Sequence, residues 1–233
     1  MAQHVNGQDR IVLPRKLLGR TRALTLGYDP EQLDRYASLA QEGFSGAGNP
    51  FLIRPIRDGE IVVDIGCGTG TDACIAAGLV GGSGRVFGIE SDSTSLSTAR
   101  LQAKKSRLRN ITFTKSYAEK LPLPDQCADV VISNGVLSQC RNKVEVIREI
   151  FRVLKPGGRV QIADILVAPD AVNIHNPRKF TDEEYLTVLR TAGLRNCVFD
   201  LHQLDPGARG IAHPDPVLML NSVHIFASKP SSN

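Results

Sequence analysis

Tryptophan is absent from this 233-residue sequence, aromatic residues are few, and the five cysteines are scattered. Because their number is odd and no two have C-x-x-C spacing, we expect neither a disulfide framework nor a metal site. A reducing, cytoplasmic setting fits this cysteine usage best. No uninterrupted apolar segment reaches membrane-spanning length, and residues 1–10 lack the apolar core of a signal peptide, so no membrane contact is expected.

The sequence also lacks a large excess of positive or negative charge, since 28 Lys and Arg against 24 Asp and Glu leave a net charge of only +4. Two basic clusters, within 15–22 and 104–109, have the charge to contact phosphates. Neither is interleaved with aromatic residues on which bases stack, so we interpret both as solvated faces. We expect no nucleic-acid partner.

From residue 61 onwards, apolar segments alternate with amphipathic ones, which is typical of βαβ units and a mostly parallel sheet. Strands are predicted at 61–65, 84–90, 111–115, 128–134, 158–167, 196–204 and 221–229. Helices are predicted at 69–81, 92–107, 142–154 and 181–194, with Asp92 or Ser93 capping the second and a Thr181–Glu184 capping box on the last.

Ahead of this alternation, apolar residues at helical spacing predict a helix over 28–43, followed by the glycine-rich turn "GFSGAGNP". We therefore expect residues 1–50 to form an N-terminal extension and cap, and residues 51–233 to form the main domain. Glycines at 43, 46 and 48 lower the cost of changing backbone angles, so we interpret 28–50 as a mobile lid. A fixed surface helix is the alternative.

The stretch "VVDIGCGTGTD", residues 62–72, predicts a ligand-binding loop, because glycines let the backbone approach a ligand closely. A dinucleotide fingerprint would place its third glycine at position 71, where Thr stands. Asp64, at the end of the first strand, is poorly placed beside a pyrophosphate. It suits a positively charged ligand such as S-adenosylmethionine (SAM).

Glu90 ends the second strand, where an acid accepts hydrogen bonds from the ribose hydroxyls of an adenosine. NAD and SAM both carry that ribose, so Glu90 does not separate them. Taken singly, Gly68 is as easily explained by helix–strand packing, and Glu90 by solvation of a strand end. The ordered combination favours a cofactor site, and Asp64 with the glycine spacing favours SAM.

Four stretches, "VVDIGCGTGTD", "VFGIESD", "LPLPDQCADVVISN" and "REIFRVLKPGGRVQIAD", together resemble the motifs of class I SAM-dependent methyltransferases over about residues 60–165. The resemblance implies a Rossmann-like, doubly wound, mostly parallel seven-stranded sheet with an N-terminal helical cap. With "LGYDPEQLDRYASLAQEGFSGAGNP" and "VISNGVLSQCRNK" included, the chain resembles the arsenite methyltransferase family over about residues 25–165.

The resemblance also implies a set of cofactor-binding residues, carried over position by position. They are Asp64, Gly66 and Gly68 at the methionine end, Cys67 in the same loop, Glu90 at the ribose, Ser91 and Asp92 beside the adenine, Ala118 and Glu119 over its edge, Ser133 and Asn134 facing the sulfonium and the acceptor, and Asn49 in the cap.

The chain departs from that family where cysteine thiolates would hold trivalent arsenic. Ala47 and Gly135 stand at two such positions, and residues 166–196 contain no cysteine. We interpret the five remaining cysteines as structural. The leading hypothesis is therefore methyl transfer from SAM to a small organic molecule. The alternatives are a soft-element methyltransferase with unexpected cysteines, and a SAM-binding scaffold or cyclase without methyl transfer.

Catalysis needs a base only if the methyl acceptor must lose a proton. Tyr117, Asp164 and His175 are the candidates near the expected mouth, although a lone His such as His175 is more readily a solvated loop residue. The sequence assigns the role to none of them. It also leaves open the acceptor atom and the oligomeric state, for which a homodimer is one option.

Overall fold

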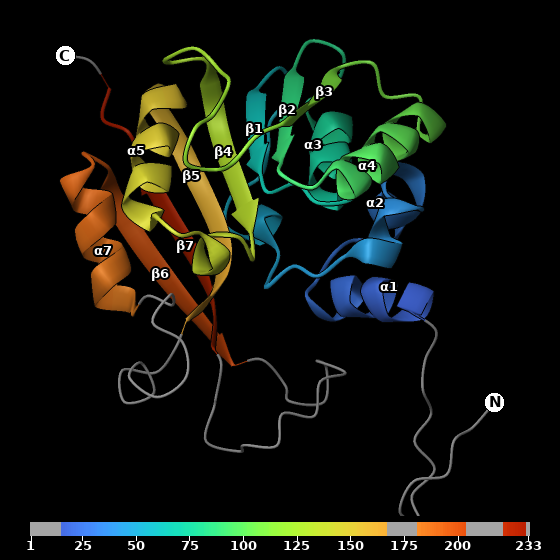
Figure 1. The fold of residues 1–233 in the computed structure, drawn as a ribbon, viewed down its shortest axis with the longest axis horizontal. Helices are drawn as coiled ribbons and strands as arrows, with labels where there is room; N and C mark the ends of the chain where they lie inside the picture. The colour runs from blue at the N-terminus through green and yellow to red at the C-terminus, as the bar shows by residue number, and fades with distance from the viewer. Residues whose placement is uncertain (1–14, 167–180, 204–220, 232–233) are drawn as a thin grey trace, which may run out of the picture.

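The computed structural model describes residues 15–166, 181–203 and 221–231, and its central feature is a seven-stranded sheet with strand order β3-β2-β1-β4-β5-β7-β6 (Figure 1). Strands β1 to β5 run parallel, while β7 is antiparallel to both β5 and β6. The strands are β1 (Ile61–Ile65), β2 (Arg85–Glu90), β3 (Ile111–Lys115), β4 (Ala128–Asn134), β5 (Leu154–Leu166), β6 (Arg195–Gln203) and β7 (Asn221–Ser228). The predicted mostly parallel, seven-stranded sheet is confirmed.

Helices cover both faces of this sheet, with α3 and α4 on one face and α5 and α7 on the other (Figure 1). Alternate residues of β1 enter the two cores, Val62 packing with the α3–α4 layer and Val63 with the α5–α7 layer. No described helix is long and apolar enough to cross a bilayer. The helices are α1 (Arg15–Thr25), α2 (Pro30–Tyr36), α3 (Thr71–Leu79), α4 (Ser93–Lys105), α5 (Lys143–Val153) and α7 (Asp182–Thr191), with short 3-10 turns η1 (Ala40–Gly43), η2 (Pro50–Leu52) and η3 (Leu137–Gln139).

The predicted helix starts are confirmed by their caps. The side chain of Asp92 accepts a hydrogen bond from the Ser95 amide and begins α4. Thr181 and Glu184 form the reciprocal capping box that begins α7. These signals are local, because each cap needs only residues within one helical turn.

Two predicted element boundaries are wrong, namely the end of one helix and the start of one strand. The helix expected over 28–43 ends at Tyr36, because the buried side chain of Gln102 on α4 accepts hydrogen bonds from the Leu39 and Ala40 amides (2.5 and 3.1 Å). Helix α5 does end at Val153, just before the "KPGG" segment, 155–158, but the strand that follows was predicted to start only at residue 158. Instead β5 begins at Leu154, and the segment forms an irregularity where β5 pairs with β4.

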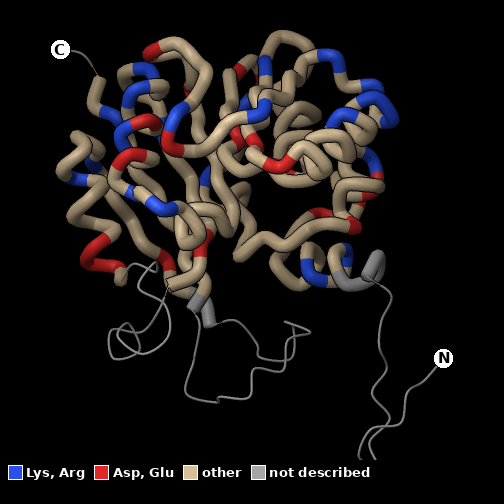
Figure 2. Tube along the Cα trace, in the orientation of Figure 1, with Lys and Arg blue, Asp and Glu red and all other residues tan. Residues whose placement is uncertain are grey.

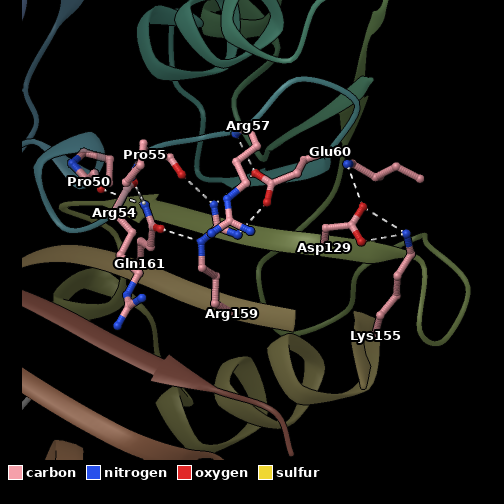
Figure 3. A network of polar contacts seen from close by, with 10 residues as sticks. Pro50, Arg54, Pro55, Arg57, Glu60, Asp129, Lys155, Arg159 and Gln161 are labelled. Atoms are coloured by element: carbon pink, nitrogen blue, oxygen red, sulfur yellow. Dashed lines mark hydrogen bonds and ion pairs between the residues drawn. The ribbon is translucent and has the colours of Figure 1, made fainter. Parts of the chain in front are cut away.

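The connection from the cap into the sheet is held by side chains of β5 (Figure 3). Gln161 donates to the carbonyl oxygens of Pro50 and Arg54 (2.9 and 3.1 Å). Arg159 forms an ion pair with Glu60, just before β1, at 2.6 Å. The chain therefore enters β1 along a fixed path.

The contact of Gln102 with the cap predicts a measurable loss of stability. Replacing Gln102 with Ala leaves the Leu39 and Ala40 amides without an acceptor, which we expect to cost roughly 2–4 kcal/mol of unfolding free energy. Urea unfolding followed by circular dichroism measures this loss. Leu101→Ala, an exposed position on the same helix, is the control and should change stability by less than about 0.5 kcal/mol. Equal effects of the two substitutions would contradict the proposed anchoring.

Candidate functional site

The glycine loop lies at the carboxyl end of β1, where the sheet order changes direction between β1 and β4. Such a switch point is where open α/β sheets bind ligands. A cavity of about 50 Å³ opens there. It is lined by the loop, the start of α3, the end of β4 and the cap, namely Gly43, Phe44, Ser45, Gly46, Asp64, Gly66, Cys67, Gly68, Thr69, Thr71, Asp72 and Asn134.

The three glycines of the loop have different roles. A Cβ on Gly66 would collide with Val136, and a Cβ on Gly70 would lie 2.9 Å from the Cβ of Ala99 on α4. A Cβ on Gly68 would meet no atom within 4 Å, and its backbone is left-handed, with φ of 51°. The packing explanation therefore applies to Gly66 and Gly70, whereas Gly68 presents backbone to open space beside the cavity.

Asp64 is a buried carboxylate in the wall of this cavity, with 2% of its surface exposed. One oxygen atom, Oδ2, has no hydrogen-bond partner among the described residues. Burial raises the pKa of Asp64 well above its usual value, and the charges of Asp72 and Glu90 add to this effect. A buried carboxylate with an unused oxygen is a site that favours a cationic hydrogen-bond donor.

Asp72, in the first turn of α3, is the centre of a buried hydrogen-bond network. The Tyr28 hydroxyl donates to its Oδ1 at 2.6 Å, and the Asn134 side-chain amide donates to its Oδ2 at 3.0 Å. Burial raises the pKa of Asp72 to about 6, although these two hydrogen bonds oppose the shift. Asp64, Asp72 and Glu90 thus bring three carboxylates to one end of the sheet.

Asn134, at the end of β4, joins this network to the cap. Its side-chain oxygen accepts hydrogen bonds from the amides of Ala47 and Gly48 (2.7 and 3.1 Å). From β7, the Nε2 of His224 accepts a hydrogen bond from the Asn49 amide, and Ser222 donates one to the Ala47 carbonyl. Residues 47–49 are therefore fixed to the sheet by side chains of two strands.

These anchors correct the hinge role expected for two of the cap glycines. A Cβ on Gly46 would collide with Asn134 and Phe44, and one on Gly48 would lie 2.6 Å from the Nε2 of His224. Close packing, rather than backbone freedom, thus explains Gly46 and Gly48. Asn49 does not line the cavity, and its side chain accepts from the Phe51 amide and donates to the Gly27 carbonyl. Its expected contact with the cofactor stays a prediction.

Glu90 binds the glycine loop directly, because its Oε2 accepts a hydrogen bond from the Gly68 amide at 3.0 Å. Its Oε1 accepts from the amides of Ser91 and Asp92 (2.7 and 2.9 Å). Asp92 itself is used as the cap of α4. Glu90, Ser91 and Asp92 therefore form one continuous turn next to the open face of Gly68.

Several other predicted site residues do not line the cavity. The hydroxyl of Ser133 donates to the Ile65 carbonyl, which holds β4 against β1. Ala118 packs against the core on the α5–α7 side, and a Glu119 carboxylate oxygen accepts from the Asn142 amide at 3.5 Å. The expected contact of Ser133 with the sulfonium and the acceptor, and those of Ala118 and Glu119 with the adenine edge, stay predictions.

The described candidates for the catalytic base lie away from the cavity. Tyr117 is 72% exposed beyond β3. Asp164 is buried on β5, where it accepts hydrogen bonds from the Tyr185 hydroxyl (2.7 Å) and the Ser138 amide (2.8 Å), and burial raises its pKa. Neither residue lines the cavity. His175 lies outside the described residues.

Sequence reasoning missed Asp72 and Tyr28. Asp72 carried a usable signal, because it is the last residue of the glycine motif and starts the helix that follows it. Tyr28 carried none, since it reaches Asp72 across 44 positions of the chain.

The sequence and the fold of this chain are similar to those of known methyltransferases. Residues 56–201 match the family model described as "Methyltransferase domain". An arsenite methyltransferase from Halobacterium salinarum is 38% identical over 141 residues, which cover 60% of this chain and 36% of that protein. A demethylmenaquinone methyltransferase from Listeria welshimeri is 32% identical over 109 residues, covering 47% of this chain and 46% of that protein.

Among solved structures, an arsenic(III) S-adenosylmethionine methyltransferase from Chlamydomonas reinhardtii has a TM-score of 0.66 to this chain at 25% identity. The match covers 91% of this chain and 73% of that one. The chain thus spans between about a third and a half of the length of the two curated relatives.

The Tyr28–Asp72 hydrogen bond predicts a pH-dependent change in stability. Because the pKa of Asp72 is about 6, its carboxylate is charged at pH 8 and mostly protonated at pH 5. Tyr28→Phe removes a donor to the charged form, so we expect a loss of about 1.5–3 kcal/mol at pH 8 and a smaller loss at pH 5. Urea unfolding at both pH values measures this, with the exposed Tyr117→Phe as control. A loss that is equal at the two pH values would refute the pairing.

Proposed function

This chain belongs to the methyltransferase-domain family, and we propose that it is an enzyme that transfers the methyl group of SAM to a small organic molecule. The resemblance to class I SAM-dependent methyltransferases predicted from the motifs is confirmed by these similarities, and SAM is the cofactor that they support. The scattered free cysteines support a cytoplasmic location as part of the same proposal. Assembly into a homodimer stays a prediction.

The observation that carries the proposal is the oxygen of Asp64 that has no partner among the described residues, in a cavity wall whose described lining contains no Lys or Arg. SAM bears two positive charges, an ammonium and a sulfonium. An ammonium that donates to Asp64 Oδ2 would satisfy this buried oxygen and offset the repulsion from Asp72 and Glu90. The residues present therefore fit the cofactor.

The remaining parts of SAM fit the turn beside Gly68. Glu90 would accept hydrogen bonds from the ribose hydroxyls once it releases the Gly68 amide, and the open space at Gly68 would admit the nucleoside. SAM supplies a methyl group on a sulfonium that is already a good leaving group. The work of the protein is therefore to orient the acceptor and to exclude water.

We infer that the cap moves to admit SAM, because the cap residues Gly43, Phe44, Ser45 and Gly46 form part of the cavity wall together with Asp64 and the glycine loop. Gly43 and Ser45 are exposed, whereas residues 47–49 are fixed by Asn134, His224 and Ser222. We assign the movement to residues 43–45, which narrows the lid expected from sequence over 28–50.

An organic acceptor is supported by the absence of thiols at the two positions where the resemblance to arsenite methyltransferases implies cysteines. Gly135 and Ala47 are neighbours, since a Cβ on Gly135 would lie 3.7 Å from that of Ala47. Two small apolar residues there offer no ligand for arsenic. Cys67, which also lines the cavity, is buried with a raised pKa, so it stays a thiol rather than the thiolate that binds soft metals.

The cofactor assignment predicts a pH-dependent affinity for SAM. Asp64 and Asp72 have raised pKa values and must be ionised to attract the ammonium, so we expect binding to tighten as the pH rises from 5 to 7.5. Asp64→Asn and Glu90→Gln should each weaken binding by about tenfold to a hundredfold at pH 7.5. Isothermal titration calorimetry measures both effects. Asp58→Asn, an exposed acid outside the cavity, is the control, and unchanged affinity in both site variants would overturn the assignment.

The proposed reaction predicts S-adenosylhomocysteine release with an organic acceptor and not with arsenite. The test is a panel of small-molecule classes, with arsenite and glutathione as one member, followed by quantification of S-adenosylhomocysteine and of methylated arsenic. We expect turnover with at least one organic class, reduced at least about tenfold by Asp64→Asn. Arsenic methylation above an enzyme-free control would favour the soft-element alternative. Tight SAM binding without product in any arm would favour a protein that does not methylate.

A further inference from the structure

A second concave site lies at the amino ends of the parallel strands, which is the end of the sheet opposite to the cofactor cavity. A groove of about 830 Å³ opens at the starts of β1 and β2, and the last residues of α2 and α3 form part of its wall. Its size is that of a site for a small organic ligand. Because β1 has five residues, the groove lies about 16 Å from the glycine loop and outside the reach of the transferred methyl group.

The charged residues that line this groove, among those that the structure describes, are arginines. Arg35, Arg85, Arg107 and Arg109 contribute four positive charges, and the described lining contains no Asp or Glu. All four are exposed, and none forms an ion pair with a residue of the described chain. Figure 2 shows Lys and Arg gathered along the end of α4 and the loop that follows it. The described lining of the groove thus carries four positive charges in a chain with a net charge of only +4.

Two cations at the same end of the sheet are neutralised on the β4–β5 side (Figure 3). Arg159 pairs with Glu60 at 2.6 Å, and Lys155 pairs with Asp129 at 2.8 Å. The strand register places Arg159 beside Val130 of β4 and Arg85 beside Ile61 of β1, so both arginines belong to this edge. Two cations on that side are therefore neutralised, whereas Arg54 and Arg57, which line a separate pocket with Arg159, form no ion pair among the described residues.

The backbone of Arg107 supports a role for its side chain. Arg107 follows the C-cap of α4 with φ of 55°, and the amides of Arg107 and Leu108 donate to the Lys104 and Ala103 carbonyls. Glycine is the favoured residue at this left-handed position, because a Cβ is strained there. The helix end is thus built at a conformational cost that places an arginine in the groove.

The rest of the described lining is mixed: it includes the polar Ser83, Ser106 and Asn110, with the Asp58 carboxylate accepting from Ser83 at 3.1 Å, and several apolar residues. Ile61 and Phe87 from the sheet, Ala77 from α3, and Leu108 and Leu123 from loops contribute side chains to it. Arginine forks bind phosphate oxygens in pairs, and an apolar floor suits the organic part of such a ligand.

We propose that this groove binds a small organic molecule carrying two or three linked phosphates, at a site separate from methyl transfer. A cluster of four arginines matches the charge of a di- or triphosphate better than that of a single carboxylate. The ligand would contact α3, whose first residues line the cofactor cavity and whose last turn lines the groove. Its position therefore fits an effector rather than the methyl acceptor.

The test measures binding of inorganic tripolyphosphate, which lacks the adenosyl group that the cofactor cavity would hold. Isothermal titration calorimetry at roughly 50 mM salt limits screening of the arginines. We expect saturable binding that weakens at least about tenfold in Arg107→Gly/Arg109→Gln. Glycine suits the left-handed backbone at 107, so this variant retains its helix end. Arg148→Gln, an exposed arginine on α5, is the matched control and should bind like the wild type.

The possible results distinguish specific binding in the groove from general attraction to positive charge. They also test the groove independently of the proposed methyl transfer. SAM affinity should be unchanged in the double variant, which shows that the cofactor cavity is intact. Absence of tripolyphosphate binding, or equal weakening by Arg148→Gln, would overturn the proposal. Tighter binding of a short single-stranded RNA than of tripolyphosphate, lost in the double variant, would assign the groove to nucleic acid and would equally overturn it.

Discussion

The hydrogen bonds of Asp72 are the interaction on which the site depends. One carboxylate, at the start of α3, accepts from Tyr28 of the cap and from Asn134 of β4. Asn134 in turn holds the amides of Ala47 and Gly48. A single buried acid thereby fixes the cap, the first helix after the glycine loop and the end of β4 relative to one another.

This arrangement has an electrostatic consequence for the neighbouring acid. Asp72 has two side-chain donors, whereas Asp64 has an oxygen with none among the described residues. Burial raises the pKa of both acids, so the site resists full ionisation until a cation arrives. The same low-dielectric environment makes a cationic ligand more strongly bound there than it would be in water.

The carboxyl and amino ends of the parallel strands carry opposite charge. The carboxyl edge gathers Asp64, Asp72 and Glu90, which favours a cationic cofactor. The amino edge of β1 and β2 carries arginines without acidic partners, which favours an anionic ligand. Helix α3 runs from one region to the other, so its packing is the physical connection between them.

The strands, the helix caps and the glycine loop can be predicted from the sequence. The strand ends that carry Asp64 and Glu90, the Asp92 cap and the Thr181–Glu184 box all depend on periodicity or on residues within one turn. The partners of Asp72 cannot be predicted in this way and are known from the fold, because Tyr28 and Asn134 are 44 and 62 positions away. The fold also decided where α2 ends, since the competing acceptor is Gln102 on α4. Contacts between side chains far apart in the sequence produce no periodic pattern in it. Their geometry is therefore fixed only when the helices pack against the sheet.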